Sequence, residues 1–153
     1  MLRSATTSDL KIVASWIPTA RDCELWAGWR VPFPIDLDTL PEAISFMDTN
    51  SFSLIIEDGR FVAFGQLVEK NSSRGHLARL IVAPALRRRG YGEALVQALV
   101  QRARAASFTP VSLNVDIANL PAIALYSKLG FRDAARPADE SESPDSRYME
   151  NAA

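Results

Sequence analysis

The stretch that decides the fold is residues 77–100, which read LARLIVAPALRRRGYGEALVQALV. A strand-like apolar run extends from His76 to Val82, and Pro84 ends it because proline cannot donate to a sheet ladder. The loop Arg87-Arg88-Arg89-Gly90-Tyr91-Gly92 then leads into a segment whose apolar positions repeat at three and four, as in an amphipathic helix. Glycines at a strand-to-helix junction let backbone N–H groups converge on an anion. The stretch predicts a phosphate-binding loop, although arginines and glycines also suit a solvated turn.

Length and composition fit one domain, residues 1–153. The chain has 153 residues, of which 48% are hydrophobic, so it is long enough for one core and too short for two ordinary domains. The net charge of -1 argues against a surface built as a whole to bind nucleic acid, and we expect no nucleic-acid partner.

The numbers of cysteines and histidines limit which cofactors and which cellular compartment we expect. Cys23 is the single cysteine and His76 the single histidine, which leaves no cluster of the ligands that structural zinc sites use. We therefore expect no metal, a reduced compartment and a cytoplasmic location. The first residues contain no long apolar run, so neither a signal peptide nor a membrane partner is expected.

Periodicity and turn residues divide the chain into short elements. Thr7 or Ser8 is expected to cap a first helix, and Asp58-Gly59 to close a hairpin. Residues 21–41 resist a simple assignment, and residues 134–147 have the composition of a solvated loop. The expected strands are residues 2–5, 52–56, 61–68, 76–82, 109–115 and 147–150, and the expected helices are residues 10–17, 40–46, 94–102 and 120–129. This order predicts a mixed α+β domain.

A second motif lies on the helix expected over residues 120–129. Asn119 stands where a side-chain oxygen caps the helix, and Tyr126 follows two turns later. At helical spacing Tyr126 suits the core, with its hydroxyl bonded to a carbonyl, as well as it suits a catalytic site. The residues alone leave both roles open.

The two motifs together resemble those of the GNAT superfamily of acyl-CoA-dependent N-acyltransferases. The matching positions are Val82-Ala83-Pro84, Arg87, Gly90 and Gly92 for the cofactor loop, and Asn119, Ala122, Tyr126 and Leu129-Gly130-Phe131 for the second signature. The resemblance implies a central, twisted, mostly antiparallel sheet of about six or seven strands, flanked by about four helices and splayed between the fourth and fifth strands.

The resemblance also implies acetyl-CoA as co-substrate. Pantetheine would insert between the strand ending at Val82 and the strand containing Leu113-Asn114-Val115, like a surrogate strand. The residues implied to bind the cofactor are Leu80, Ile81, Val82, Arg87, Arg88, Arg89, Gly90, Tyr91, Gly92, Glu93, Asn119, Ala122 and Tyr126.

The implied reaction is attack on the thioester by a primary amine of a small molecule or a peptide. The backbone N–H of Val82 is expected to stabilise the oxyanion, and Tyr126 to protonate the leaving thiolate. Ribosomal-protein alanine acetyltransferases, which the carboxyl half resembles, carry a glutamate where this chain has Asn114. A catalytically weak acyl-CoA sensor is therefore the alternative function.

The general base is left open. His76 is a candidate because imidazole ordinarily titrates at about pH 6.5 and because arylalkylamine acetyltransferases place histidines on this strand. A histidine solvated at a strand edge is the alternative interpretation. Glu69 and Asp116 are further candidates for the base.

The acceptor amine is expected to contact the tryptophan-rich segment. Family members build their acceptor wall there, although aromatic rings that anchor a loop would give the same pattern. The tentative acceptor contacts are Trp26, Trp29, Phe33 and Asn114, with Asp22 and Glu24 available either to attract a cationic amine or to solvate the loop. We expect a monomer or a homodimer.

Overall fold

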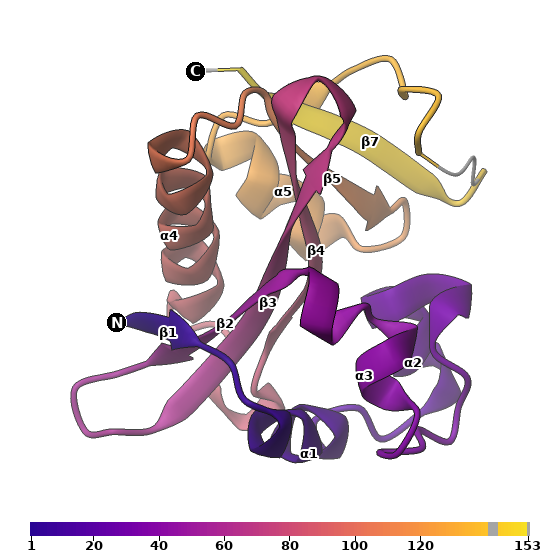
Figure 1. The fold of residues 1–153 in the computed structure, drawn as a ribbon, viewed down its shortest axis with the longest axis vertical. Helices are drawn as coiled ribbons and strands as arrows, with labels where there is room; N and C mark the ends of the chain where they lie inside the picture. Colours follow the sequence, from indigo (N-terminus) through magenta and orange to yellow (C-terminus); the bar gives the residue numbers. More distant parts are fainter. Residues whose placement is uncertain (141–143, 153) are drawn as a thin grey trace. The chain divides into compact units, whose positions relative to one another are not determined.

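The computed structural model describes residues 1–140 and 144–152, apart from the side chain of Ser72 (Figure 1). The strands are β1 Leu2–Ser4, β2 Asn50–Ile55, β3 Phe61–Lys70, β4 Arg74–Val82, β5 Val111–Asp116, β6 Arg132–Asp133 and β7 Ser146–Asn151. The helices are α1 Thr7–Ser15, α2 Ala20–Ala27, α3 Leu40–Ala43, α4 Tyr91–Ala105 and α5 Leu120–Lys128, with 3-10 turns η1 Gly28–Arg30, η2 Phe46–Asp48, η3 Asn71–Ser73 and η4 Pro84–Leu86. Within the described residues, no helix is both long and apolar enough to cross a membrane.

The strands form one seven-stranded sheet in the order β1-β2-β3-β4-β5-β7-β6. Strand β5 pairs in parallel with β4, with Gly75–Leu77 opposite Val111–Leu113, and in antiparallel with β7 along all six of its residues. The pairing of β5 with β4 thus involves only the first part of β4, although β4 itself continues to Val82. The predicted mixed α+β class with a mostly antiparallel sheet is confirmed.

The chain divides into two compact units. Unit 1 comprises Met1–Gln66 and Arg79–Leu95, and unit 2 comprises Leu67–Ala78 and Val96–Ala153. Strands β3 and β4 and helix α4 each run from one unit into the other. The single domain expected from the sequence stays a prediction.

The core of unit 1 lies among helices α1, α2 and α3 and the strand segments of this unit. Its buried members include Leu10 of α1, Trp26 of α2, Leu40 of α3, Phe64 of β3 and Ile81 of β4. Full burial of a large apolar side chain contributes about 1.5–3 kcal/mol to folding, so this cluster fixes where the end of β4 lies within the unit.

Helix α1 begins at Thr7, and its cap is Thr6 rather than the predicted Thr7 or Ser8. The Thr6 hydroxyl accepts from the Asp9 N–H at 3.3 Å, and the Asp9 carboxylate accepts from the Thr6 N–H at 2.9 Å. Asp9 also binds Arg3 at 2.6 Å and Ser53 at 3.0 Å. Burial raises the pKa of Asp9, but these hydrogen bonds outweigh it and hold the pKa below its usual value.

The tryptophan-rich segment contains helix α2, which periodicity did not predict. Thr19 caps it by accepting from the Asp22 N–H at 3.1 Å. Cys23 and Trp26, three residues apart on one face, are buried in the core. The thiol of Cys23 donates to the carbonyl of Val31 at 3.3 Å, so this cysteine is a packed core residue.

The carboxyl end of the chain is more ordered than its composition predicted. The prediction that residues 134–147 form a solvated loop is wrong for Glu140. Its side chain is 6% exposed and pairs with Arg74 at 2.7 Å. The terminal strand is also longer than expected, because β7 pairs with β5 along its whole length. Residues 141–143 of this loop lie outside the described residues.

Candidate active site

The loop between β4 and α4, all within unit 1, has the geometry of an anion-binding junction. Positive φ values at Arg88 (64°) and Gly90 (84°) turn the backbone before α4 begins at Tyr91. The Gly90 carbonyl accepts from the Ala94 N–H at 3.1 Å and so starts the helix. The first N–H groups of a helix lack acceptors within it and carry its positive partial charge.

This junction fits a diphosphate. An added Cβ at Gly90 would meet no atom within 4 Å, so the space above the glycine is open. The side chains of Arg87, Arg88 and Arg89 are exposed around it, and guanidinium groups bind phosphate oxygens in pairs. The residues predicted to hold the phosphate end of CoA therefore converge within unit 1.

Strand β4 presents the Val82 amide on the edge that faces away from β3. The next residue, Ala83, donates its N–H to the Val62 carbonyl of β3 at 2.8 Å. Because successive N–H groups of an extended chain point to opposite edges, the Val82 N–H points the other way. The Val82 carbonyl on that same edge accepts from Arg87 Nε at 3.4 Å. This orientation leaves the Val82 amide suitably directed for a ligand.

The three aromatic residues predicted for the acceptor wall differ in their surroundings. Trp26 is buried, and its indole N–H donates to the carbonyl of Arg79 at 2.9 Å. Trp29 is 79% exposed with Arg30 stacked over its ring, and Phe33 is 40% exposed. Trp26 thus anchors the segment to β4, while Trp29 and Phe33 remain available for contact.

In unit 2, helix α5 positions Tyr126. Asn119 caps the helix by accepting from the Ala122 N–H at 3.4 Å, as predicted. The Tyr126 ring packs edge to face on Phe131 at 6.0 Å, and no described residue hydrogen-bonds its hydroxyl. Since no fully buried side-chain oxygen or nitrogen of the described residues lacks a partner, this hydroxyl reaches accessible space.

The environment of Tyr126 also keeps it protonated. Burial raises the pKa of Tyr126 from its ordinary value to about 12. A tyrosine with this pKa holds its proton at neutral pH, so its hydroxyl is present as a hydrogen-bond donor.

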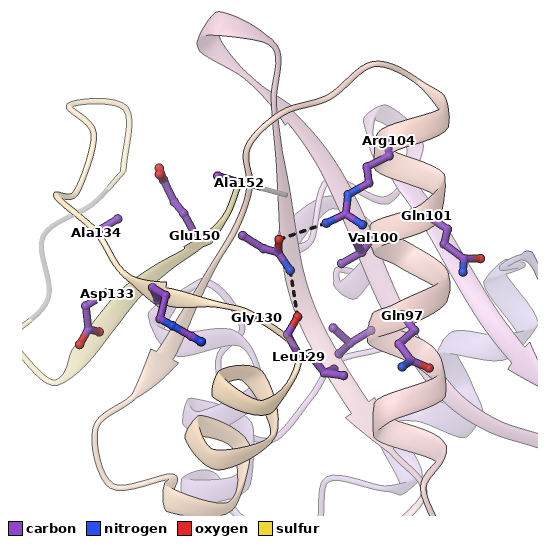
Figure 2. A pocket seen from close by; sticks show the side chains of 13 residues that line it. Gln97, Val100, Gln101, Arg104, Leu129, Gly130, Asp133, Ala134, Glu150 and Ala152 are labelled. Atoms are coloured by element: carbon purple, nitrogen blue, oxygen red, sulfur yellow. Dashed lines mark hydrogen bonds between the residues drawn. The ribbon is translucent and has the colours of Figure 1, made fainter.

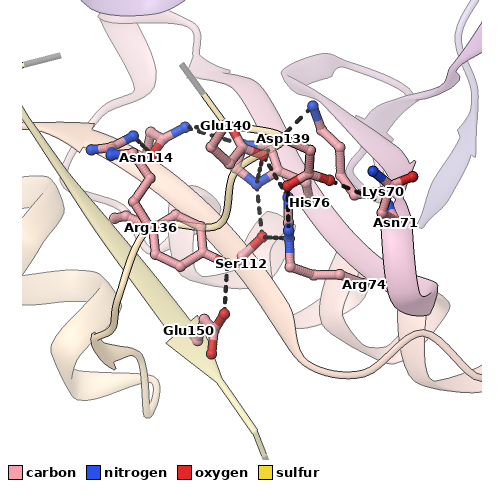
Figure 3. A network of polar contacts seen from close by, with 11 residues as sticks. Lys70, Asn71, Arg74, His76, Ser112, Asn114, Arg136, Asp139, Glu140 and Glu150 are labelled. Carbon is pink, nitrogen blue, oxygen red and sulfur yellow. Dashed lines mark hydrogen bonds and ion pairs between the residues drawn. The ribbon is translucent and has the colours of Figure 1, made fainter. Parts of the chain in front are cut away.

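His76 lies in a polar network of unit 2 rather than in solvent (Figure 3). Its Nδ1 lies 2.7 Å from Ser112 Oγ and 3.4 Å from Glu140 Oε1. Its Nε2 lies 3.4 Å from Asn114 Nδ2. The interpretation of His76 as a solvated edge residue is therefore wrong.

The hydrogen bonds around Asn114 define which nitrogen of His76 accepts a proton. Arg136 donates to Asn114 Oδ1 at 2.8 Å, which directs the Asn114 amide N–H group toward His76 Nε2. In the neutral ring Nε2 is then the acceptor and the hydrogen is on Nδ1, facing Ser112 and the Glu140 carboxylate.

Glu140 is a candidate site residue that sequence reasoning missed. Burial raises its pKa, but the charges of His76 and Lys70 and hydrogen bonds from Arg74 and Asn114 outweigh it and hold the pKa below its usual value. Its Oε2 accepts from Asn114 at 3.3 Å, so a carboxylate lies beside the residue that replaces the expected glutamate. An acidic residue in a stretch of Ala, Pro, Ser and Asp gives no sequence signal of this contact.

The other candidate bases lie in less suitable surroundings. Glu69 is exposed and lines a small cavity of about 420 Å³ with Lys70, Asn71 and Asp139. Asp116 accepts from the Ala118 N–H at 2.8 Å in the turn before α5. Of these candidates, His76 is the one buried within a hydrogen-bonded network.

A larger cavity of about 840 Å³ in unit 2 contains none of the predicted site residues (Figure 2). Val96 and Val100 of α4 and Leu129 after α5 contribute its apolar lining. Asn151 joins its sides, accepting from Arg104 at 3.0 Å and donating to the Leu129 carbonyl at 3.0 Å.

The nature of the β4–α4 junction is decided by comparison with known families. A family model described as the acetyltransferase (GNAT) family matches residues 21–131, which include both sequence motifs. The chain belongs to the GNAT acetyltransferase family. Members of this family use acyl-CoA, which agrees with the diphosphate geometry of the loop.

Solved structures of GNAT proteins share this fold along nearly the whole chain. Spermidine N-acetyltransferase from Vibrio cholerae, in complex with CoA and spermine, has a TM-score of 0.78 at 18% identity and covers 99% of this chain and 94% of its own. Ribosomal-protein-alanine N-acetyltransferase from Brucella melitensis has a TM-score of 0.73 at 16% identity, covering 100% and 99%. A GNAT acetyltransferase from Staphylococcus aureus has a TM-score of 0.74 at 15% identity, covering 99% and 98%.

Proposed function

We propose that this GNAT protein transfers the acetyl group of acetyl-CoA to a primary amine of a small molecule or a peptide, by direct attack in a ternary complex. The observation that carries the proposal is the open, glycine-turned junction at the start of α4, with Arg87, Arg88 and Arg89 around it. A diphosphate fits there by charge and by the direction of the backbone N–H groups.

The residues of β4 and α4 would bind and orient the co-substrate. The backbone of Leu80, Ile81 and Val82 would pair with its amide groups. The loop from Arg87 through Tyr91, Gly92 and Glu93 would hold its phosphates. Asn119 and Ala122, which bond each other at the start of α5, are proposed as further contacts.

Acetyl-CoA supplies an activated thioester when it is bound. The chain then has three tasks as the C–N bond forms and the C–S bond breaks. The Val82 N–H donates to the carbonyl oxygen as charge develops on it, His76 Nε2 takes the proton that the amine loses, and the Tyr126 hydroxyl protonates the departing sulfur.

Replacing His76 with glutamine should lower kcat about tenfold to hundredfold at neutral pH, because glutamine still bonds Ser112 but accepts no proton. The measurement is the pH dependence of kcat, whose acidic limb should disappear in the variant. Glu140→Gln is the companion variant, and it should move that limb because it removes the carboxylate facing Nδ1. A limb unchanged in His76→Gln would assign the base elsewhere.

The proposed function is tested by cofactor binding and by turnover. Acetyl-CoA at about 100 times its Kd should stabilise the protein by about 2.7 kcal/mol in a thermal-shift assay, and Arg89→Glu should lose this shift. Lys11→Glu, an equal charge change at an exposed residue of α1, should keep it. Thiol release should follow with at least one class among simple amines, aminoglycosides, amino acids and peptides.

The alternative, an acyl-CoA sensor, is motivated by Asn114 in place of the glutamate. It predicts the thermal shift without thiol release from any amine class, whereas absence of the shift at saturating acetyl-CoA would reject both functions. The Glu140 carboxylate beside Asn114 favours the enzyme.

A further inference from the structure

Arg79 is a half-buried cation of unit 1 without an acidic partner among the described residues. Partial burial and the nearby charge of Arg30 lower the pKa of Arg79 to about 10, and it keeps its positive charge at neutral pH. No carboxylate among the described residues forms an ion pair with Arg79 or Arg30. Charges withdrawn from solvent are ordinarily paired, so an arginine held in this way indicates an anion that the described residues do not provide.

The guanidinium of Arg79 is held in a fixed position. Its Nε donates to Gln66 Oε1, and Gln66 is fully buried, with its amide nitrogen donating to the Ile44 carbonyl at 3.1 Å and to Ser51 Oγ at 2.9 Å. The backbone of Arg79 has a φ of 51°, an unfavourable value for a residue with a Cβ, and its carbonyl accepts from Trp26. Several contacts thus maintain one strained arrangement, as is common at binding sites.

The outer nitrogens of Arg79 remain available for a ligand. They have no acceptor among the described residues, yet no fully buried side-chain nitrogen of those residues lacks a partner. The two Nη groups therefore reach accessible space at the end of a half-buried stem. Such a planar pair of donors matches the two oxygens of a carboxylate.

A second cation lies close to Arg79. Arg30 is exposed and stacks over the Trp29 ring at 5.2 Å, and its charge acts on Arg79. Both arginines belong to unit 1, where the tryptophan-rich segment meets β4 and where Arg79 precedes Ile81 by two residues. The place where the tryptophan-rich segment, predicted to contact the acceptor amine, meets β4 is therefore positively charged.

We infer that Arg79 and Arg30 recognise a negatively charged group, a carboxylate, on the acceptor amine. The inference rests on the proposed function and narrows it to amines such as amino acids. It argues against polyamine acceptors, because the positive charges of Arg79 and Arg30 would repel a polycation. Glu24, one of the acidic residues considered for attracting a cationic amine, pairs instead with Arg21 at 3.3 Å.

The test compares matched acceptors that differ in one charge. Alanine, serine, phenylalanine and lysine are each assayed against their carboxamides and against spermidine, with kcat/KM measured by thiol release from acetyl-CoA. At least one free acid should exceed its carboxamide about tenfold to hundredfold, as expected for a charge-assisted bidentate contact. Equal rates for acids and carboxamides, or a preference for spermidine, would overturn the inference.

Variants assign this preference to the two arginines. Arg79→Met keeps the half-buried stem without the charge, and Arg30→Gln changes an exposed residue that does not support the core. Both should bring the ratio of acid to carboxamide close to one, chiefly through KM, while Lys11→Gln should leave the ratio unchanged. A preference that survives Arg79→Met would contradict the assignment.

Two further measurements separate the possible causes of failure. If no amine releases thiol from acetyl-CoA, the proposed function is wrong. The affinities of the wild type and of Arg79→Met for the same acids and carboxamides are then measured by NMR titration, which needs no turnover. Weaker binding of the acids to Arg79→Met supports the anion site, and equal binding overturns it. If Arg79→Met instead impairs only the use of succinyl-CoA relative to acetyl-CoA, the recognised carboxylate belongs to the acyl group and the inference is wrong.

Discussion

Replacing Gly90 with valine is expected to weaken acetyl-CoA binding at least about a hundredfold, measured as the Kd in a calorimetric titration. Gly90 has a φ of 84°, which a β-branched residue adopts only with strain, so the loop would shift away from the geometry that directs its N–H groups outward. A valine side chain would also fill the open space above the junction.

Gly59→Val is the matched control for this variant. Gly59 has a φ of 86° and likewise has no atom within 4 Å of an added Cβ, but it lies in the β2–β3 turn of the same unit. Both substitutions should cost similar stability, roughly 1–2 kcal/mol for a left-handed residue with a side chain. Equal loss of acetyl-CoA affinity in the two variants would show that the effect is a general destabilisation.

Replacing Tyr126 with phenylalanine is expected to lower kcat about a hundredfold to a thousandfold, within the range found for loss of a general acid. The Kd of acetyl-CoA should change little, because phenylalanine keeps the edge-to-face contact with Phe131. Since the pKa of Tyr126 is raised to about 12, the acid stays protonated well above neutral pH. The wild-type kcat should therefore show no alkaline loss from this residue below about pH 10.

Tyr148→Phe provides the control for the loss of a hydroxyl. Tyr148 is buried in the same unit, burial also raises its pKa to about 12, and its hydroxyl donates to Glu150 at 2.6 Å. Removing this hydroxyl should lower kcat far less than removing that of Tyr126, because it is bonded to Glu150 and Ser112 and the cationic contacts of Arg74 and Arg136 are with the ring. A kcat for Tyr126→Phe that matches the wild type would remove Tyr126 from the mechanism.

Sequence reasoning predicted the elements whose signals are local. The hairpin at Asp58-Gly59, the end of β4 before Pro84 and the cap at Asn119 follow from turn chemistry and periodicity, and the structure has all three. It missed α2, because a helix of eight residues that buries only Cys23 and Trp26 has too short an apolar pattern to stand out among prolines.

The site was predictable in part for the same reason. Arg87, Gly90 and Tyr126 belong to motifs with fixed spacing, so their neighbours in the chain define their environment. Glu140 and Arg79 do not, since their environment comes from partners far away in the sequence. Glu140 meets Arg74 across 66 residues, and Arg79 receives the indole of Trp26 across 53.

The sequence by itself determined the β4–α4 junction, because a strand, a proline, the positive-φ Gly90 and a helix start lie close together in the chain and act through backbone geometry. Only the tertiary structure decided that His76 lies against Ser112, Asn114 and Glu140, and that Arg79 has no carboxylate partner among the described residues. Those properties depend on burial and on the balance of charges in space, which no local pattern records. The loop proposed to bind the cofactor is thus a local feature, and the proposed base and acceptor site are consequences of folding.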